Sequence, residues 1–117
     1  MTPEGKVKSR VRKLLARYQG MFTYWPVPRG FGRATVDVFG CYRGRFFAIE
    51  VKRDGEKPTL RQTQELSDVE AGMGRTFVIA GEDDPRLMRL EEWLNELTDT
   101  IDDDPHFTLD EVRRRTL

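Results

Sequence analysis

The chain has 117 residues, of which 38% are hydrophobic, and its 20 basic side chains balance 20 acidic ones. This size suits one domain with one core, and the aromatic and aliphatic content excludes general disorder. No apolar run is long enough to span a membrane and no apolar signal-peptide core opens the chain, so we expect an intracellular, cytoplasmic protein. The single cysteine, Cys41, excludes an intrachain disulfide and a usual structural zinc site.

The neutral total hides an uneven distribution of charge. Residues 1–61 carry 14 basic and five acidic side chains, whereas residues 62–117 carry six and 15. A basic half with a few isolated carboxylates is typical of nucleases, because cations bind phosphates and acids bind metal. Charges that only solvate helix faces explain the composition equally well.

The first predicted element is a helix from Pro3 to about Gln19, with Thr2 as its N-cap. Apolar residues recur there at helical spacing, and most of the cations fall on the exposed sides. Glu4 lies on the inward stripe with Val7, where it either stabilises the helix dipole or faces a site. A strand over residues 21–27 and a basic, glycine-containing loop over residues 28–34 follow.

The segment from residue 35 to residue 52 predicts a β-hairpin with a two-residue turn at Arg43 and Gly44. That turn pairs Asp37 with Glu50 across the two strands, with Cβ atoms roughly 4.5–5.5 Å apart. Like charges this close destabilise a sheet unless a cation lies between them. An amphipathic strand with a polar, solvated end is the alternative interpretation.

The hairpin residues match the chemistry of a divalent-metal site. Mg²⁺ prefers oxygen ligands, and Asp37, Glu50 and the backbone carbonyl of Val51 supply three. Lys52 projects from the same face as Glu50, where an ammonium can orient a water molecule or stabilise charge on phosphorus. The sequence therefore predicts a metal site with a lysine beside it.

A second helix is predicted from Thr59 to about Gly72 or Gly74. Gln62 either closes a capping box with Thr59 or reaches the site with its amide. The buried side of this helix is expected to comprise Leu66, Val69 and Met73.

A short apolar strand over residues 75–80 and a helix capped by Asp84 complete the predicted domain, residues 1–98. Residues 99–117 form an acidic tail in which Thr108 to Glu111 matches a capping box, compatible with a short helix. The order α-β-β-β-α-β-α predicts an α/β fold, a mixed sheet flanked by helices.

Asp37 followed by Glu50-Val51-Lys52 resembles the PD-(D/E)XK nuclease signature. The amino-acid sequence of the hairpin is similar to that of the VRR-NUC branch. The opening residues Pro3–Lys8 also resemble single-domain members of that branch, which are common in bacteriophage genomes. The hairpin block, with the residues that follow it, reads Gly40-Cys41-Tyr42-Arg43-Gly44-Arg45-Phe46-Phe47-Ala48-Ile49-Glu50-Val51-Lys52, then Lys57-Pro58-Thr59 and Gln62. The family has Pro before the first Asp, where this chain has Val36, which neither adds nor removes a ligand.

The resemblance implies a restriction-endonuclease-like core that hydrolyses DNA phosphodiester bonds with Mg²⁺ or Mn²⁺. It implies Asp37 and Glu50 as metal ligands, Lys52 as the catalytic lysine, Glu4 as the first-helix acid, which binds metal directly or through water, and Gln62 as a further catalytic polar residue. Some members work as homodimers on four-way (Holliday) junctions, so we expect a homodimer by analogy. The expected phosphate-binding residues are Lys6, Lys8, Arg12, Arg29, Arg33, Arg53, Lys57 and Arg61.

The leading hypothesis is thus a metal-dependent DNA endonuclease selective for branched, flap or Holliday-junction DNA, because no base-reading motif is present. A non-catalytic DNA-binding module that kept the nuclease fold is the alternative. A scaffolding protein that docks a basic partner through its acidic half is a third hypothesis.

Overall fold

The computed structural model describes residues 1–27 and 35–100. It confirms the predicted α/β class and the order of elements. The predicted tail helix, Arg29 and Arg33 lie outside the described residues. No helix in the described ranges is both long and apolar enough to cross a membrane. The elements are α1 (Pro3–Leu15), β1 (Phe22–Tyr24), β2 (Val38–Tyr42), β3 (Arg45–Lys52), α2 (Leu60–Ala71), β4 (Arg75–Ala80) and α3 (Pro85–Asp99).

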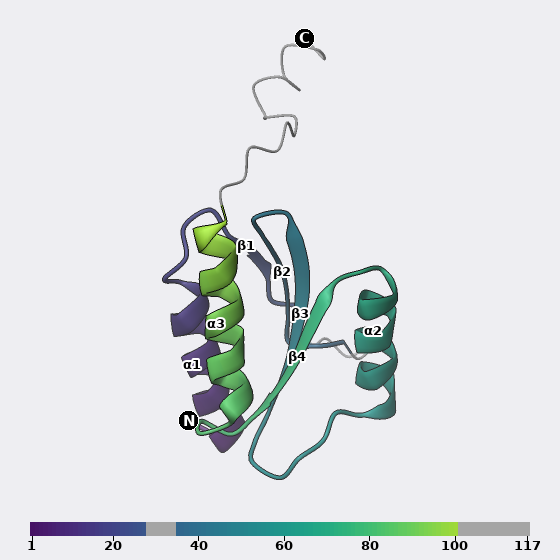
Figure 1. Cartoon of the computed structure of the whole chain (residues 1–117). Helices are drawn as coiled ribbons and strands as arrows, with labels where there is room; N and C mark the ends of the chain where they lie inside the picture. The colour runs from purple at the N-terminus through teal and green to yellow at the C-terminus, as the bar shows by residue number, and fades with distance from the viewer. Residues whose placement is uncertain (28–34, 101–117) are drawn as a thin grey trace.

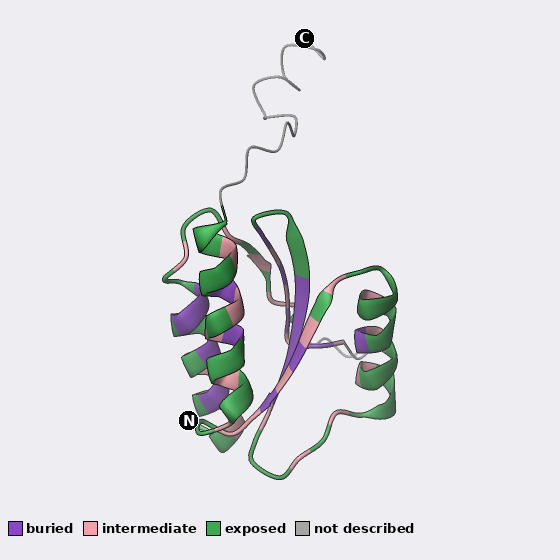
Figure 2. Cartoon of the chain, viewed as in Figure 1, coloured by how far each residue is buried: buried purple, intermediate pink, exposed green. Residues whose placement is uncertain are grey.

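The four strands form one mixed sheet in the order β1-β2-β3-β4. β2 pairs antiparallel with β1 and with β3, whereas β3 and β4 are parallel. α1 and α3 cover one face of the sheet and α2 covers the other (Figure 1). β3 is therefore paired on both edges and covered on both faces, and residues 47–51 are all buried (Figure 2).

Two apolar clusters, one on each face of the sheet, hold the layers together. The larger packs α1 and α3 against the strands, through residues such as Val11, Phe47 and Leu94. The smaller joins Leu66 of α2 to Ala48 of β3. Phe47 and Ala48 are neighbours in sequence and point to opposite faces, so β3 contributes to both clusters, as the alternation along this strand predicts.

Side chains cap the helices at the predicted positions. Thr2 accepts from the Gly5 amide at 3.0 Å, and Asp84 accepts from the Arg86 amide at 2.9 Å. α1 nevertheless ends at Leu15 rather than near Gln19, because the chain tightens there into hydrogen bonds between residues three apart. β1 likewise covers only three residues of the strand predicted over 21–27.

The prediction of a buried Met73 was wrong. α2 ends at Ala71, and Met73 has a φ of 72° with 86% of its surface exposed. The left-handed turn reverses the chain into β4, so Met73 leaves the helical stripe that buries Leu66.

The hairpin register agrees with the predicted one. Arg43 and Gly44 have φ angles of 52° and 78°, the left-handed pair that a tight two-residue turn requires. Tyr42 consequently pairs with Arg45, and Val38 pairs with Ile49. If this register is continued by one residue beyond the pair of Val38 and Ile49, Asp37 lies opposite Glu50.

Gly40 is the position in the hairpin where a side chain has no room, because a Cβ there would enter the ring of Phe47. We expect Gly40→Ala to destabilise the fold by about 2–4 kcal/mol, since the buried ring must move. Urea unfolding measures this loss, with Gly72→Ala as the control, because a Cβ at Gly72 makes only ordinary contacts. Equal midpoints for the two variants would contradict the expectation.

Candidate active site

The end of β3 and the start of β2 bring two carboxylates together. The Val51 amide donates a hydrogen bond to Asp37 Oδ2 at 2.7 Å, which ties Asp37 to β3 just past its partner Glu50. Glu65 of α2 accepts from the Val36 amide at 3.2 Å and also from the Thr35 hydroxyl, so α2 fixes the chain leading into Asp37.

Glu50 is the one charged residue among the buried side chains of the described core, with 1% of its surface exposed. Neither of its carboxylate oxygens has a hydrogen-bond partner within the described ranges. Lys52 Nζ lies 3.2 Å from Glu50 Oε2, which gives an ion pair. Among the described residues, the Lys52 ammonium is thus the cation that compensates the buried Glu50 carboxylate, which has no further hydrogen bond.

The two carboxylates titrate very differently. Burial, followed by the neighbouring Asp37, raises the pKa of Glu50 to about 8, and Lys52 offsets only part of the increase. Burial would also raise the pKa of Asp37, but its contacts with Glu50, the Val51 amide and Lys8 outweigh burial and lower it. The two carboxyls therefore titrate as a coupled pair, with the pKa raised at Glu50 and lowered at Asp37.

The backbone offers a third oxygen beside the pair. The Lys52 carbonyl accepts from the Gly81 amide at 3.0 Å, on the β4 side of the strand. Successive carbonyls alternate along a strand, so the Val51 carbonyl faces the other way, toward Asp37.

This donor set fits Mg²⁺ or Mn²⁺. Among the residues that the structure describes, no three carboxylate, imidazole or thiol groups converge, so a fully protein-made cage is not formed. Mg²⁺ commonly binds through one or two carboxylates and keeps several water molecules. Asp37, Glu50 and the Val51 carbonyl would hold such an ion, and the Glu50 oxygens, which accept no hydrogen bond in the described residues, are the observation that supports the fit.

Two predicted site residues are not gathered into this pair. Gln62 accepts from the Thr59 amide at 2.9 Å, and Thr59 accepts from the Gln62 amide at 3.2 Å, so the capping box is formed. Glu4 lies in the first turn of α1, and the residue one turn later on its face, Lys8, is the one that contacts Asp37.

Lys8 is the contact that the sequence did not predict. Its Nζ lies 3.0 Å from Asp37 Oδ1, although the sequence placed it among the cations free to bind phosphate. The contact joins residues 29 positions apart, on a helix and a strand whose relative placement only the fold determines. The spacing of Lys8 from Glu4 was the one available signal, because it puts Lys8 next to the inward stripe.

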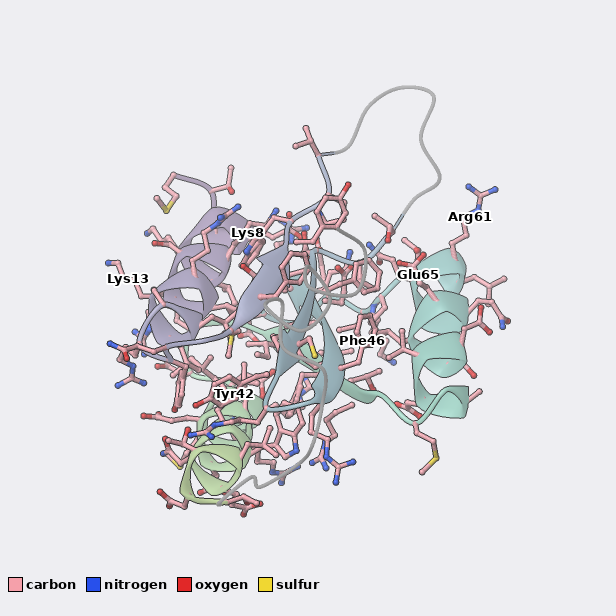
Figure 3. All side chains as sticks on the ribbon, turned by 90° about the horizontal axis from the view of Figure 1, so that it is seen from above. Lys8, Lys13, Tyr42, Phe46, Arg61 and Glu65 are labelled. Atoms are coloured by element: carbon pink, nitrogen blue, oxygen red, sulfur yellow. The ribbon has the colours of Figure 1, made fainter. Side chains whose placement is uncertain are left out.

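The other predicted phosphate-binding residues are dispersed. Arg12 stacks on Trp25 at 3.9 Å, and Arg53 pairs with Glu56. Lys6 and Lys57 are exposed, while Arg61 lies on α2, across the sheet from α1 (Figure 3).

A cleft of about 600 Å³ lies beyond the ends of β3 and β4, and its lining includes neither Asp37 nor Glu50. Its lining contains five carboxylates but only two basic residues, Lys57 and Arg86, so it is unsuited to phosphate. The carboxylates are Asp54, Glu56, Glu82, Asp83 and Asp84.

Comparison with known proteins adds no relative. The chain matches no family model, no curated protein and no solved structure. The resemblance to VRR-NUC nucleases therefore stays a prediction from the motif.

Proposed function

We propose that the chain is a metal-dependent DNA endonuclease that hydrolyses phosphodiester bonds. The observation that supports this function best is the pair of carboxylates Asp37 and Glu50, with Lys52 Nζ 3.2 Å from the buried Glu50. This set fits hydrolysis of a phosphodiester because it combines hard-cation ligands with a lysine at one place.

Each residue of the site has a proposed role in the reaction. Asp37 and Glu50, with the Val51 carbonyl, would bind Mg²⁺ or Mn²⁺, which neutralises phosphate charge and makes a bound water more acidic. The Lys52 ammonium, only 12% exposed, is placed to stabilise negative charge on the phosphate or to orient the attacking water. The Val51 amide keeps Asp37 turned toward the site.

The proposed substrate is branched, flap or four-way-junction DNA, bound through its backbone by a homodimer. The density of basic residues on α1 supports backbone binding, since four lysines and arginines follow Lys6 on that helix. Affinity should accordingly fall steeply with added salt. A panel of single-stranded, duplex, flap and junction DNA, with Mg²⁺, Mn²⁺ or EDTA, tests the substrate directly.

Replacing Asp37 with Asn is expected to weaken Mg²⁺ binding at least tenfold, because one of two anionic ligands is lost. Isothermal titration calorimetry at pH 8 measures the change. Asp68→Asn on the exposed side of α2 is the control. Tight DNA binding by the wild type with no heat of Mg²⁺ binding would instead favour a non-catalytic DNA-binding module.

A further inference from the structure

Asp37 and Glu50 each lie beside one lysine ammonium, but they differ in their hydrogen bonds. Asp37 Oδ2 accepts from the Val51 amide at 2.7 Å, and Asp37 Oδ1 lies 3.0 Å from Lys8 Nζ. Both oxygens of Glu50 lack a hydrogen-bond partner in the described part of the chain. An arriving divalent cation therefore meets an ammonium at each carboxylate, Lys8 at Asp37 and Lys52 at Glu50, and the Lys8 side chain is the more exposed of the two, at 35% against 12%.

We propose that Lys8 is a positioning residue that occupies the Asp37 carboxylate when metal is absent and gives it up on metal binding, after which its ammonium contacts a substrate phosphate. The inference rests on the proposed function and deepens it. It assigns two roles to Lys8. The ammonium pairs with Asp37 when metal is absent, and it contacts a DNA phosphate next to the scissile bond when metal is bound.

Electrostatics favours the exchange at Lys8. An ammonium and a divalent cation repel each other, and the Lys8 side chain is less buried than that of Lys52, so it is the one free to leave its carboxylate. The Lys8 side chain is 35% exposed, on a flexible four-carbon stem, and can turn toward solvent at little cost.

The backbone of Lys8 cannot follow its side chain away from the site. Its neighbours Val7 and Val11 are 2% and 0% exposed and pack into the larger core cluster. The displaced ammonium consequently stays within a side-chain length of Asp37, beside any phosphate that the metal ligands would hold. It also faces the α1 side, where the basic residues gather.

The test is a pair of measurements on Lys8→Met with opposite expected signs. Mg²⁺ binding measured by calorimetry should become about three- to tenfold tighter, since a competing and repelling charge is removed. Binding of a flap DNA is measured by fluorescence anisotropy in EDTA and in Ca²⁺. In Ca²⁺, Lys8→Met should bind about two- to fivefold more weakly than the wild type. The slope of log affinity against log salt concentration in Ca²⁺ should fall by about one, which corresponds to the loss of one phosphate contact.

Lys13→Met removes the same charge from an exposed position of the same helix and should leave Mg²⁺ binding unchanged. Lys8→Gln, which keeps a polar side chain, should reproduce the tighter Mg²⁺ binding if Lys8→Met does not fold. A merely structural role for Lys8 would weaken metal and DNA binding together.

The outcomes separate the two proposals. Mg²⁺ binding by the wild type with unchanged or weaker binding by both Lys8 variants overturns the role of Lys8 and leaves the nuclease proposal standing. Absence of Mg²⁺ binding by the wild type and by every variant overturns both.

Discussion

Lys52→Met is expected to lower the rate of DNA cleavage by about 10²–10³-fold, because it removes the cation best placed to stabilise charge on the phosphate. Lys52 Nζ lies 3.2 Å from Glu50 Oε2, and its side chain is only 12% exposed, so neither solvent nor another described lysine replaces it. Single-turnover cleavage of a flap or junction substrate with saturating Mg²⁺ measures the effect.

The same variant should keep its Mg²⁺ affinity within a few-fold, since Lys52 contributes no ligand. Arg89→Met removes an exposed cation from α3, outside the proposed site, and is the control that should cleave at the wild-type rate. Wild-type turnover by Lys52→Met would remove the catalytic role of this lysine. Loss of metal binding would show that it maintains the site instead.

Glu50→Gln is expected to stabilise the metal-free protein at alkaline pH, which is the second large effect. The folded pKa of Glu50 is about 8, against an ordinary value of 4.5. The protonated carboxyl therefore contributes stability that is fully present below pH 4.5 and is lost as pH rises through 8. The wild type should lose on the order of 2–4 kcal/mol across this range, and the Gln variant should not.

Urea unfolding in EDTA at pH 5, 7 and 9 measures this difference. The lowered pKa of Asp37 acts only at more acidic pH, so it does not obscure the window. Glu92→Gln, on the exposed side of α3, controls for the loss of one negative charge. Parallel pH profiles for the wild type and Glu50→Gln would mean that Glu50 is ionised in the folded protein without metal.

Added Mg²⁺ should reverse the order of stability of the wild type and Glu50→Gln. A ligand that binds only the folded state stabilises it in proportion to the logarithm of its concentration over the dissociation constant. The wild type should gain stability with Mg²⁺ at pH 8, whereas Glu50→Gln, which lacks one of the two anionic ligands, should gain little.

The local parts of this structure could be predicted from the sequence because short-range chemistry determines them. The turn at Arg43 and Gly44 sets the hairpin register up to the pair of Val38 with Ile49, and the next residue on each side is Asp37 and Glu50. Helix caps at Thr2, Thr59 and Asp84 follow from side chains within three residues of the amides that they accept from.

Features that depend on packing between elements could not be predicted. Met73 has a suitable helical spacing, but the turn into β4 exposes it. Lys8 has no sequence neighbour that indicates Asp37, and Glu65 has none that indicates Val36. Each of these contacts needs the helices to be docked on particular ends of the strands, which periodicity does not specify.

Helix α1 contributes Lys8 to the candidate site and Val7 and Val11 to the core, so variants of this helix affect both. Val7 and Val11 are buried on either side of Lys8 along the helix, so any change that lets α1 shift moves the lysine relative to Asp37. Truncating either valine is then expected to disturb the contact between Lys8 and Asp37 as well as to lower stability, so this helix couples the packing of the core to the position of one charged side chain.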